Sequence, residues 1–308
     1  MRSRLFLSAA LALFALPILA AERYVAITID DLPTQRGNSL AEVQGITSRL
    51  IEQIRGAGTP VTAFVNEAKV HDGGEQELNA RTALLEQWLD IGVELGNHTY
   101  SHADINSVGL DAYEQDLLRG EKILKQLLRT RGKTLTYFRH PYLHTGKDAQ
   151  TKAALAAFLR DHNYVVAPVT IDNDEWIYGA AYDKAAEKKD EAAMRRIGTD
   201  YLAYMNQMFE FSEHVAQQVF GRDIKQTLLI HASALNAQYY GALTDMMKKR
   251  GYAFVSLSDA LKDPAYRSED KYVGPRGISW LFRWGQGKPL DDSKAPQIPS
   301  YIRELSGY

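Results

Sequence analysis

Two histidines four positions apart, His98 and His102, have the residue type and spacing that could bind one metal ion. They lie in the stretch NHTYSHADIN, residues 97–106 of a 308-residue chain. On one helical turn both imidazoles would project from the same face and reach an ion at Zn–N distances of about 2.0 Å. Such a pair also occurs by chance, and the alternative is an exposed helix start that Asn97 caps.

Two adjacent carboxylates could complete this site. Asp30 and Asp31 end a β-branched apolar segment near the N-terminus. Asp31 with the two histidines would make a three-ligand set that leaves a position open for water, as in catalytic metal sites. Asp30 lies on the opposite side of the expected strand, where it would not easily bind the same ion, and a role as general base is natural for it. The alternative is an acidic turn before Leu-Pro.

Further polar side chains follow two other apolar segments. Arg139, in FRHPY, either pairs with a carboxylate such as Asp30 or is a solvated residue before a surface turn. Pro141 then turns the chain so that Tyr142 and its backbone N–H can face the site. His231 closes TLLIH and is either a satisfied core histidine or a general acid for a leaving group.

Two apolar residues are candidates for the wall of a substrate pocket. Leu229 lies two positions before His231 and therefore on the same face of the expected strand. Trp176, in IDNDEWIY, is either pocket wall or core. Asp172 precedes it at the end of another expected strand.

The elements that must position these residues alternate along the chain. Apolar patterning predicts strands at 23–33, 60–66, 93–98, 135–142, 164–172 and 226–233, and helices at 40–58, 80–92, 110–132, 147–163 and 240–251. This alternation predicts a parallel sheet with helices outside, as a barrel or an open doubly wound sheet. In both folds the functional groups lie at the C-terminal ends of the strands, where these candidates occur.

Two regions depart from the alternating pattern. From Tyr182 to Gly221 the sequence is rich in helix formers and charge, which predicts one or two long exposed helices that elaborate the core. After Pro264 the sequence is rich in Gly, Pro and Trp and has little periodicity. This tail is expected to wrap the surface rather than to form a domain.

Residues 1–21 have the layout of a secretory signal peptide. Arg2 and Arg4 precede an apolar run from Leu5 to Leu19, and small residues follow at Ala20 and Ala21. An uncleaved membrane anchor is the alternative, but the run is shorter than the ~20 residues that a spanning helix needs. We therefore expect a periplasmic or secreted protein that has no stable membrane anchor after cleavage.

The composition limits both fold class and partners. With 45% hydrophobic and 24% charged residues, the chain is an ordinary globular protein. It has no cysteine, which excludes cysteine zinc sites and thiol nucleophiles, so a metal would have to be bound by His, Asp and Glu. The formal charge of −2 becomes −4 without the two leader arginines, and nucleic acid is therefore not an expected partner.

Five short motifs, TIDD, HTYSH, RHPY, DNDEW and LLIH, follow one another in the order found in the NodB-type polysaccharide deacetylases, carbohydrate esterase family 4. The chain resembles this family from about Arg23 to Leu261. The resemblance implies a distorted (β/α) barrel over residues 22–262, with a helical insertion at about 180–222 and an irregular C-terminal extension, 263–308, that packs on it. It also implies an exported metal-dependent hydrolase that removes acetyl groups from N-acetylated sugars of a polysaccharide or oligosaccharide, peptidoglycan or chitin-like.

The resemblance also implies roles at the matched positions. Asp31, His98 and His102 match the ligands of a metal ion whose bound water attacks the amide carbonyl, and Asp30 matches the general base. His231 matches the general acid that protonates the leaving amine.

Other matched residues support these groups. Arg139 matches the residue that orients the base, and the backbone N–H of Tyr142 would help the metal to hold the oxyanion. Trp176 and Leu229 match the lining of the acetyl pocket, and Pro141 is placed with Tyr142 among the substrate-binding residues.

The sequence departs from the family pattern at the fourth motif. The usual Asp before the Trp is Glu175, so Asp172 is our choice to tune His231 or Arg139, while the roles of Glu175 and Asp174 stay open. His140 and His144 are additional histidines beside the site, which either contact substrate or are structural.

Several properties stay open at this stage. Zinc is the default for such ligands, but cobalt, nickel and iron(II) accept them too. The acetylated glycan and the oligomeric state cannot be read from the sequence. Alternative functions are hydrolysis of O-acetyl esters or small amides at the same site, or an inactive carbohydrate-binding relative.

Overall fold

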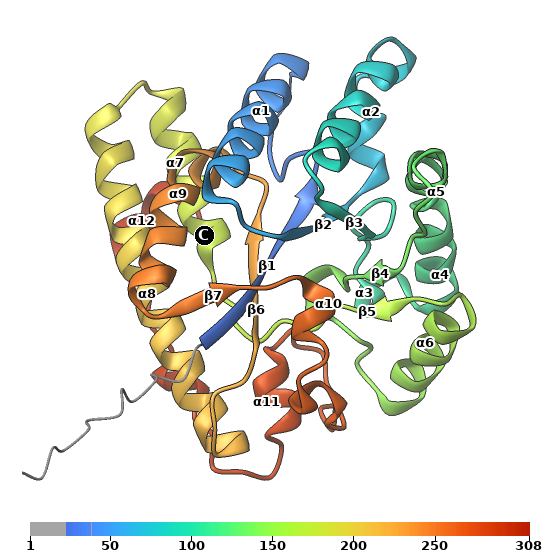
Figure 1. Cartoon of the computed structure of the whole chain (residues 1–308), viewed down its shortest axis with the longest axis vertical. Helices are drawn as coiled ribbons and strands as arrows, with labels where there is room; N and C mark the ends of the chain where they lie inside the picture. Colours follow the sequence, from blue (N-terminus) through green and yellow to red (C-terminus); the bar gives the residue numbers. More distant parts are fainter. Residues whose placement is uncertain (1–22, 38) are drawn as a thin grey trace, which may run out of the picture.

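The computed structural model describes residues 23–37 and 39–308. The predicted signal peptide, 1–21, lies outside the described residues. Seven strands form one sheet in the order β5-β4-β3-β2-β1-β6, with β7 paired to β1, and all of these pairings are parallel. Figure 1 shows the sheet in the centre with helices around it. The predicted α/β class with a distorted barrel of parallel strands is confirmed.

The elements have the following bounds. The strands are β1 (Arg23–Leu32), β2 (Val61–Val65), β3 (Glu94–Asn97), β4 (Tyr137–Phe138), β5 (Val165–Val166), β6 (Gln226–His231) and β7 (Tyr252–Phe254). The helices are α1 (Leu40–Ala57), α2 (Gly74–Asp90), α3 (Ile105–Val108), α4 (Leu110–Arg119), α5 (Lys122–Thr130), α6 (Ala149–Asp161), α7 (Glu175–Glu187), α8 (Glu191–Phe220), α9 (Ala234–Lys249), α10 (Leu257–Ala260), α11 (Trp280–Trp284) and α12 (Ser300–Ser306). Within the described part of the chain, no helix is long and apolar enough to cross a membrane.

Strand β1 is the centre of the sheet. It pairs with β2, β6 and β7, and every residue from Val25 to Leu32 is buried. Its β-branched residues suit a strand that is covered on both faces. The strand ends at the two candidate carboxylates, and Asp30 lies opposite His231 in the register with β6.

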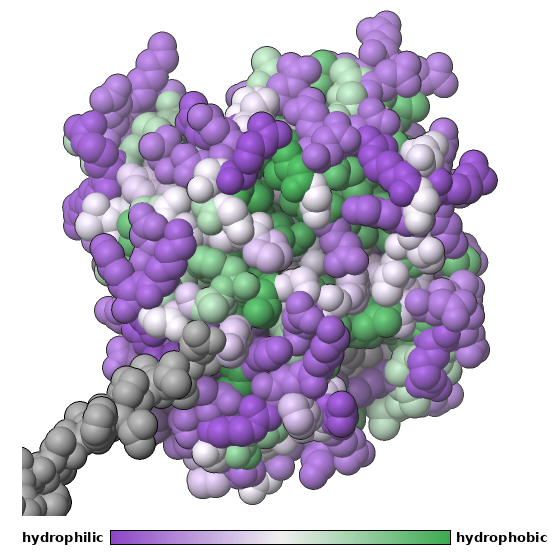
Figure 2. All heavy atoms as spheres, in the orientation of Figure 1, coloured by the Kyte–Doolittle hydropathy of each residue, from purple (hydrophilic) through white to green (hydrophobic). Residues whose placement is uncertain are grey.

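The outer helices turn their apolar sides to the sheet. Helix α1 begins at a capping box between Ser39 and Glu42, and the chain leaves it through Gly58 in the left-handed region, at φ 64°. Val43, Leu50 and Ile54 are its buried stripe. Figure 2 shows hydrophilic residues over much of the outer rim of this face and hydrophobic ones mainly toward its middle.

The single helix predicted for 110–132 is two helices, α4 and α5. The break is at Gly120, where a Cβ would lie only 2.5 Å from the backbone nitrogen of Tyr100. The backbone of residues 98–102 therefore occupies the space that a side chain at position 120 would need. The apolar periodicity of the sequence does not predict this contact, because the contacting backbone belongs to a different segment of the chain.

The helices predicted for Tyr182–Gly221 are α7 and α8, but the prediction that they are exposed was wrong. The 30-residue helix α8 buries Tyr201, Met205 and Phe209 in the main core. The tail also contributes to the core. Trp280 and Leu281 of α11 are buried, and the backbone N–H of Trp280 donates to the backbone carbonyl of Val169. Both regions therefore form walls of the fold around the sheet.

Candidate active site

The predicted chemical groups meet at the C-terminal ends of three strands of the sheet, β1, its neighbour β6, and β3, which β2 separates from β1. Asp30 and Asp31 end β1, His98 follows β3 directly, and His231 is the last residue of β6. His102 comes from the loop after β3. These strands lie within one continuous sheet, so their ends share one edge.

Asp31, His98 and His102 are arranged as a possible metal site. Their ligand atoms lie within 4.8 Å of one another. Asp31 Oδ1 is 3.8 Å from His98 Nε2 and 3.6 Å from His102 Nε2. The same oxygen is buried and has no hydrogen-bond partner among the described residues. A buried carboxylate oxygen between two imidazole nitrogens fits a bound divalent cation, because such an ion would satisfy all three atoms.

The tautomer of His98 suits this role. Its Nδ1 lies 2.8 Å from the backbone carbonyl of Arg139. A carbonyl can only accept, so Nδ1 carries the proton, and the lone pair of Nε2 is left for a ligand. Burial lowers the pKa of His98 well below its ordinary value and also lowers the pKa of His102, and both imidazoles therefore stay neutral.

The histidines do not lie on a helical turn, as the spacing had predicted, but in a loop between β3 and α3. Asn97 is not a helix cap: its Oδ1 accepts from the Thr99 N–H and so turns the chain out of the strand. Asp116 of α4 accepts from both the N–H and the hydroxyl of Ser101. His102 itself adopts φ 57°, a left-handed conformation that no regular helix contains.

Left-handed backbone is concentrated at the site. Seven described residues other than glycine have positive φ, and four of them are Asp31, Thr99, His102 and Tyr142. Each such residue costs about 1–3 kcal/mol and persists only where the surroundings hold it in place. These conformations therefore lower the stability of the fold, and in return they orient the side chains of the site.

The conformation of Asp31 corrects one prediction about its neighbour. Simple alternation would place Asp30 on the other side of the strand, yet Asp30 Oδ2 is 3.7 Å from His98 Nε2, as near as Asp31 Oδ1. The register with β2 shifts between Ile29 and Leu32, and Asp31 has φ 71°. This irregularity turns both carboxylates toward the same histidine.

Lys69 is a charged neighbour that the sequence reasoning missed. Its ammonium nitrogen lies 3.5 Å from Asp31 Oδ1. Burial alone would raise the pKa of Asp31, but the charge of Lys69 holds it below its usual range. No short motif marked Lys69, because it reaches the site from the turn of residues 67–70 that follows β2.

Asp30 and Arg139 form the second part of the site. Burial raises the pKa of Asp30 to about 6, and the nearby Arg139 charge opposes a larger rise. Arg139 is completely buried, so of the two alternatives the solvated arginine before a surface turn is excluded. Its Nη2 donates to Thr28 Oγ1 at 2.7 Å, while Nε and Nη1 have no hydrogen-bond partner in the described part of the chain. Arg139 therefore acts on Asp30 through its charge and not through a direct hydrogen bond.

His231 is held by Glu175, not by Asp172. Glu175 Oε2 lies 2.9 Å from His231 Nδ1, and Oε1 accepts from the His231 backbone N–H at 2.8 Å. Asn236 donates to the same carboxylate and fixes its position. Burial alone would lower the pKa of His231, but the Glu175 charge and hydrogen bond raise it to about 9. The expectation that Asp172 tunes His231 is corrected, because the longer Glu175 reaches the ring from the first turn of α7.

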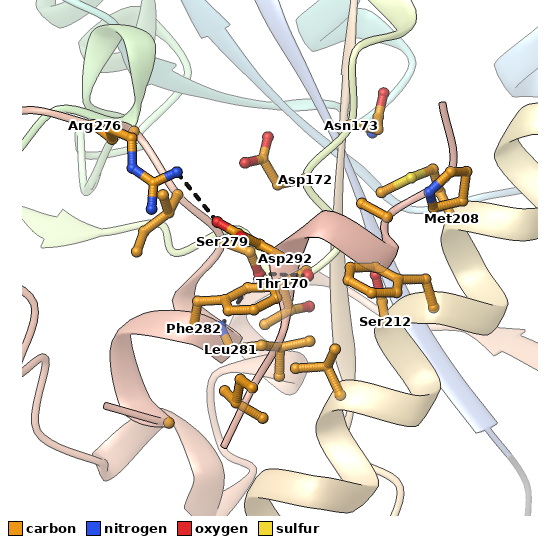
Figure 3. Close-up of a pocket in the computed structure, with 18 of the residues that line it drawn as sticks. Thr170, Asp172, Asn173, Met208, Ser212, Arg276, Ser279, Leu281, Phe282 and Asp292 are labelled. Atoms are coloured by element: carbon orange, nitrogen blue, oxygen red, sulfur yellow. Dashed lines mark hydrogen bonds and ion pairs between the residues drawn. The ribbon is translucent and has the colours of Figure 1, made fainter. Parts of the chain in front are cut away.

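Asp172 lies close enough to Arg139 for the two charges to interact. The Arg139 charge opposes the rise in its pKa to about 7, which burial and the neighbouring Asp174 cause. Asp174 is exposed and its backbone N–H donates to the Tyr204 hydroxyl. Figure 3 shows the Asp172 carboxylate directed into a cavity. This placement is compatible with the prediction that Asp172 tunes Arg139.

The predicted pocket residues have different surroundings. Leu229 lies on the opposite face of β6 from Leu228 and Ile230, since it packs in a separate apolar cluster. The rings of Trp176 and Tyr308 pack edge to face, with their centroids 4.7 Å apart. Trp280, from the tail, joins the Leu229 cluster and was not predicted, because nothing in the sequence links the two segments.

The rim beside His102 consists of the residues after β4. Pro141 is buried at the start of a short 3₁₀ turn, and Tyr142 is 55% exposed with its ring centroid 4.5 Å from that of His102. His144 Nδ1 is 2.7 Å from Asp104 Oδ1, which ties this rim to the loop after His102. His140 is buried and stacks on Trp280. Burial lowers the pKa of His140 to about 3, as suits a structural ring.

The N-terminal half of the chain is similar to known proteins. Residues 20–159 match the family model for polysaccharide deacetylases. The predicted resemblance to the polysaccharide deacetylases is confirmed. Over 152 residues the chain is 24% identical to a peptidoglycan-N-acetylglucosamine deacetylase from Bacillus cereus, which covers 49% of this chain and 46% of that relative. The chain thus spans about half the length of this curated relative.

The chain is similar in fold to a solved structure of the carbohydrate esterase family 4 type. A variant of BA3943, a family 4 pseudoenzyme from Bacillus anthracis, with restored enzymatic activity, superimposes with a TM-score of 0.52 at 16% identity, over 79% of this chain and 68% of that one. A family 4 carbohydrate esterase from Streptomyces lividans in complex with acetate has a TM-score of 0.46 at 18% identity, over 78% and 97%. The first of these shows the fold alone.

The polysaccharide deacetylase match covers only one side of the site. It includes β1, β3 and β4, which position Asp30, Asp31, His98, His102 and Arg139. It ends at residue 159, before Glu175 and His231. The pairing of the last two residues therefore rests on the structure.

The metal site makes a direct prediction. His102→Ala removes one of three ligands and is expected to weaken zinc or cobalt binding by about 100-fold or more. Elemental analysis and isothermal titration of chelator-stripped protein measure this. His162→Ala, which changes an exposed histidine after α6, is the matched control and should bind as the unchanged chain does. Stoichiometric metal in His102→Ala would contradict the assignment.

The Glu175 contact makes a second prediction. Glu175→Gln removes the charge that stabilises the imidazolium, so the pKa of His231 should fall from about 9 to its ordinary value of 6.5 or lower. NMR titration of the imidazole in metal-free protein measures the change. Asp172→Asn, which removes a carboxylate that does not contact His231, should leave that pKa near 9. An equal fall in both variants would show that Glu175 has no special role.

Proposed function

We propose that the chain is an exported, metal-dependent hydrolase that removes acetyl groups from N-acetylated sugars of a glycan. The observation that carries this proposal is geometric: Asp30 and His231 occupy paired positions of β1 and β6, beside the cluster of Asp31, His98 and His102. Burial raises the pKa of Asp30 to about 6, and Glu175 raises the pKa of His231 to about 9. Near neutral pH the carboxylate is ionised and the imidazole protonated. A base and an acid are thus available together.

Asp31, His98 and His102 would hold one divalent ion beside this pair. When bound, such an ion supplies a Lewis acid and lowers the pKa of water. Zinc is the default ion, and cobalt, nickel and iron(II) accept the same ligands. Lys69 adds a fixed positive charge to this side of the site, where negative charge develops on the carbonyl oxygen.

The residues of the chain divide the remaining work. Asp30 takes a proton from water as the water oxygen attacks the acetyl carbonyl carbon. The C–N bond then breaks, and His231 gives its proton to the nitrogen, so that the products are acetate and a free amine. Arg139 stabilises the ionised form of Asp30, and Glu175 stabilises the protonated form of His231.

The basic amine product explains why His231 needs its high pKa. An amine leaves an amide only after protonation, whereas an alkoxide leaves an ester more readily. An acid that is protonated near neutral pH and can give its proton to the leaving nitrogen therefore favours N-acetyl over O-acetyl groups as substrate. The pseudoenzyme relative shows that the fold can exist without activity, but here Asp30, Asp31, His98, His102 and His231 are all present.

Acetate release tests the proposed function. Purified protein is incubated with peptidoglycan, chitooligosaccharides and O-acetylated xylan, with and without chelator. We expect chelator-sensitive release from an N-acetylated glycan and at least about 100-fold less from Asp30→Asn, which keeps the metal but lacks the base. Equal activity of Asp30→Asn would show that Asp30 is not the base. No release from any N-acetylated glycan by metal-loaded protein would overturn the proposal.

The pH dependence gives a further prediction. Asp30 must be ionised, so kcat/KM should fall as the pH drops through about 6, or somewhat lower because a bound cation favours the carboxylate. His231 must be protonated, so kcat/KM should fall as the pH rises through about 9. In Glu175→Gln the alkaline limb should move to lower pH while the acidic limb stays. An unchanged alkaline limb would contradict the role of His231 as acid.

A further inference from the structure

A cavity of about 540 Å³ lies between α8, the segment 170–174 and the C-terminal tail. Neither α8 nor the tail belongs to residues 20–159, which match the family model. Figure 3 shows Asp172 and Asn173 on one side of this cavity and Phe282 and Leu281 on the other. The volume is typical of sites for small molecules.

The cavity adjoins the candidate active site. Gly277 lines it, and a Cβ at this position would lie 1.8 Å from the carbonyl oxygen of Tyr142, so the tail backbone packs directly on the site rim. Asn106, just beyond the histidine loop, donates to the carbonyl of Pro275. On the inner side Asp172 lines the cavity and lies within the field of Arg139, which also acts on Asp30.

One wall of the cavity is aromatic. Phe282 of α11 and Phe211 of α8 are stacked, with ring centroids 6.1 Å apart and an interplanar angle of 27°. Both rings are partly exposed, whereas their neighbour Leu281 is buried. A partly exposed aromatic pair in a cavity offers a flat apolar surface to a ligand.

The facing wall is polar. It includes the Asp172 carboxylate, for which no ion pair within 4.0 Å is found among the described residues. The rim charges Arg276 and Asp292 pair with each other at 3.1 Å, so they do not select a charged ligand. An acyl chain would cover the Asp172 carboxylate with apolar groups and displace water from it, at a cost in free energy. A pyranose ring fits both walls, because it has an apolar face of C–H groups and hydroxyl donors at its edge.

We propose that this cavity binds an uncharged sugar residue of the glycan near the one that is deacetylated, with its face on Phe282 and its hydroxyls donating to Asp172. The inference rests on the proposed function and adds to it: the substrate is an oligosaccharide or polymer, and α8 and the tail supply its second binding site. The helical insertion and the C-terminal extension would thereby make activity depend on the length of the glycan.

Kinetics on N-acetylglucosamine oligosaccharides of increasing length test this. For the unchanged chain kcat/KM should rise with length, and Phe282→Ala should lower that gain about tenfold, mainly through KM. Phe282→Trp, which keeps an aromatic surface, should retain the gain. Phe158→Ala, which alters a partly buried phenylalanine of α6 outside the cavity, is the matched control and should also retain it. A gain in Phe282→Ala equal to that of the control would overturn the inference.

Binding gives a readout that does not need activity. Isothermal titration of chelator-stripped protein with an N-acetylglucosamine oligosaccharide, which stays intact without the metal, should show about tenfold weaker binding for Phe282→Ala than for Phe158→Ala, with both variants checked for native circular dichroism. Competition by a fatty acid but not by the sugar would mean that the cavity takes an acyl chain, and would overturn the inference. Sugar binding that depends on Phe282 without acetate release would instead support the sugar site and count against the proposed function.

Discussion

The contact between one oxygen of Asp31 and two imidazole nitrogens is the interaction on which the site depends. Asp31 Oδ1 is buried, lies 3.6 Å from His102 Nε2 and 3.8 Å from His98 Nε2, and accepts no hydrogen bond from the described residues. Neutral imidazoles cannot compensate a buried carboxylate, and Lys69 offers a single charge at 3.5 Å. The left-handed backbone at Asp31 and His102 holds this arrangement in place, and a divalent ion would complete it.

Around this contact the fold gives the proposed base, Asp30, and the proposed acid, His231, different charged partners. Asp30 and His231 face each other across β1 and β6, and burial acts against the charged form of both. Arg139 limits the rise in the pKa of Asp30, while Glu175 reverses the fall that burial would cause in His231. Two buried partners thus set the protonation states that hydrolysis of an amide needs.

The sequence predicted the parts of the fold that depend on local pattern. Strand β1 and helix α1 carry clear apolar periods and end signals, and Asp30, Asp31, His98 and His231 stand at strand ends, so their meeting could be predicted. What failed depends on distant contacts. The break at Gly120 follows from the approach of the Tyr100 backbone, and the shared side of the two aspartates follows from an irregular register with β2. The choice between Asp172 and Glu175 needed the position of α7, and Trp280 joins Leu229 from a segment without periodicity.

The central claim is that Asp31, His98 and His102 bind one divalent ion. Anomalous diffraction from crystals of the cobalt-loaded protein, recorded on both sides of the cobalt absorption edge, tests it most directly. We expect one strong peak at about 2.0–2.2 Å from a carboxylate oxygen of Asp31 and from the Nε2 atoms of both histidines, with Lys69 displaced from the carboxylate. A cobalt-loaded crystal with no peak at these residues, or with its peak elsewhere, would contradict it.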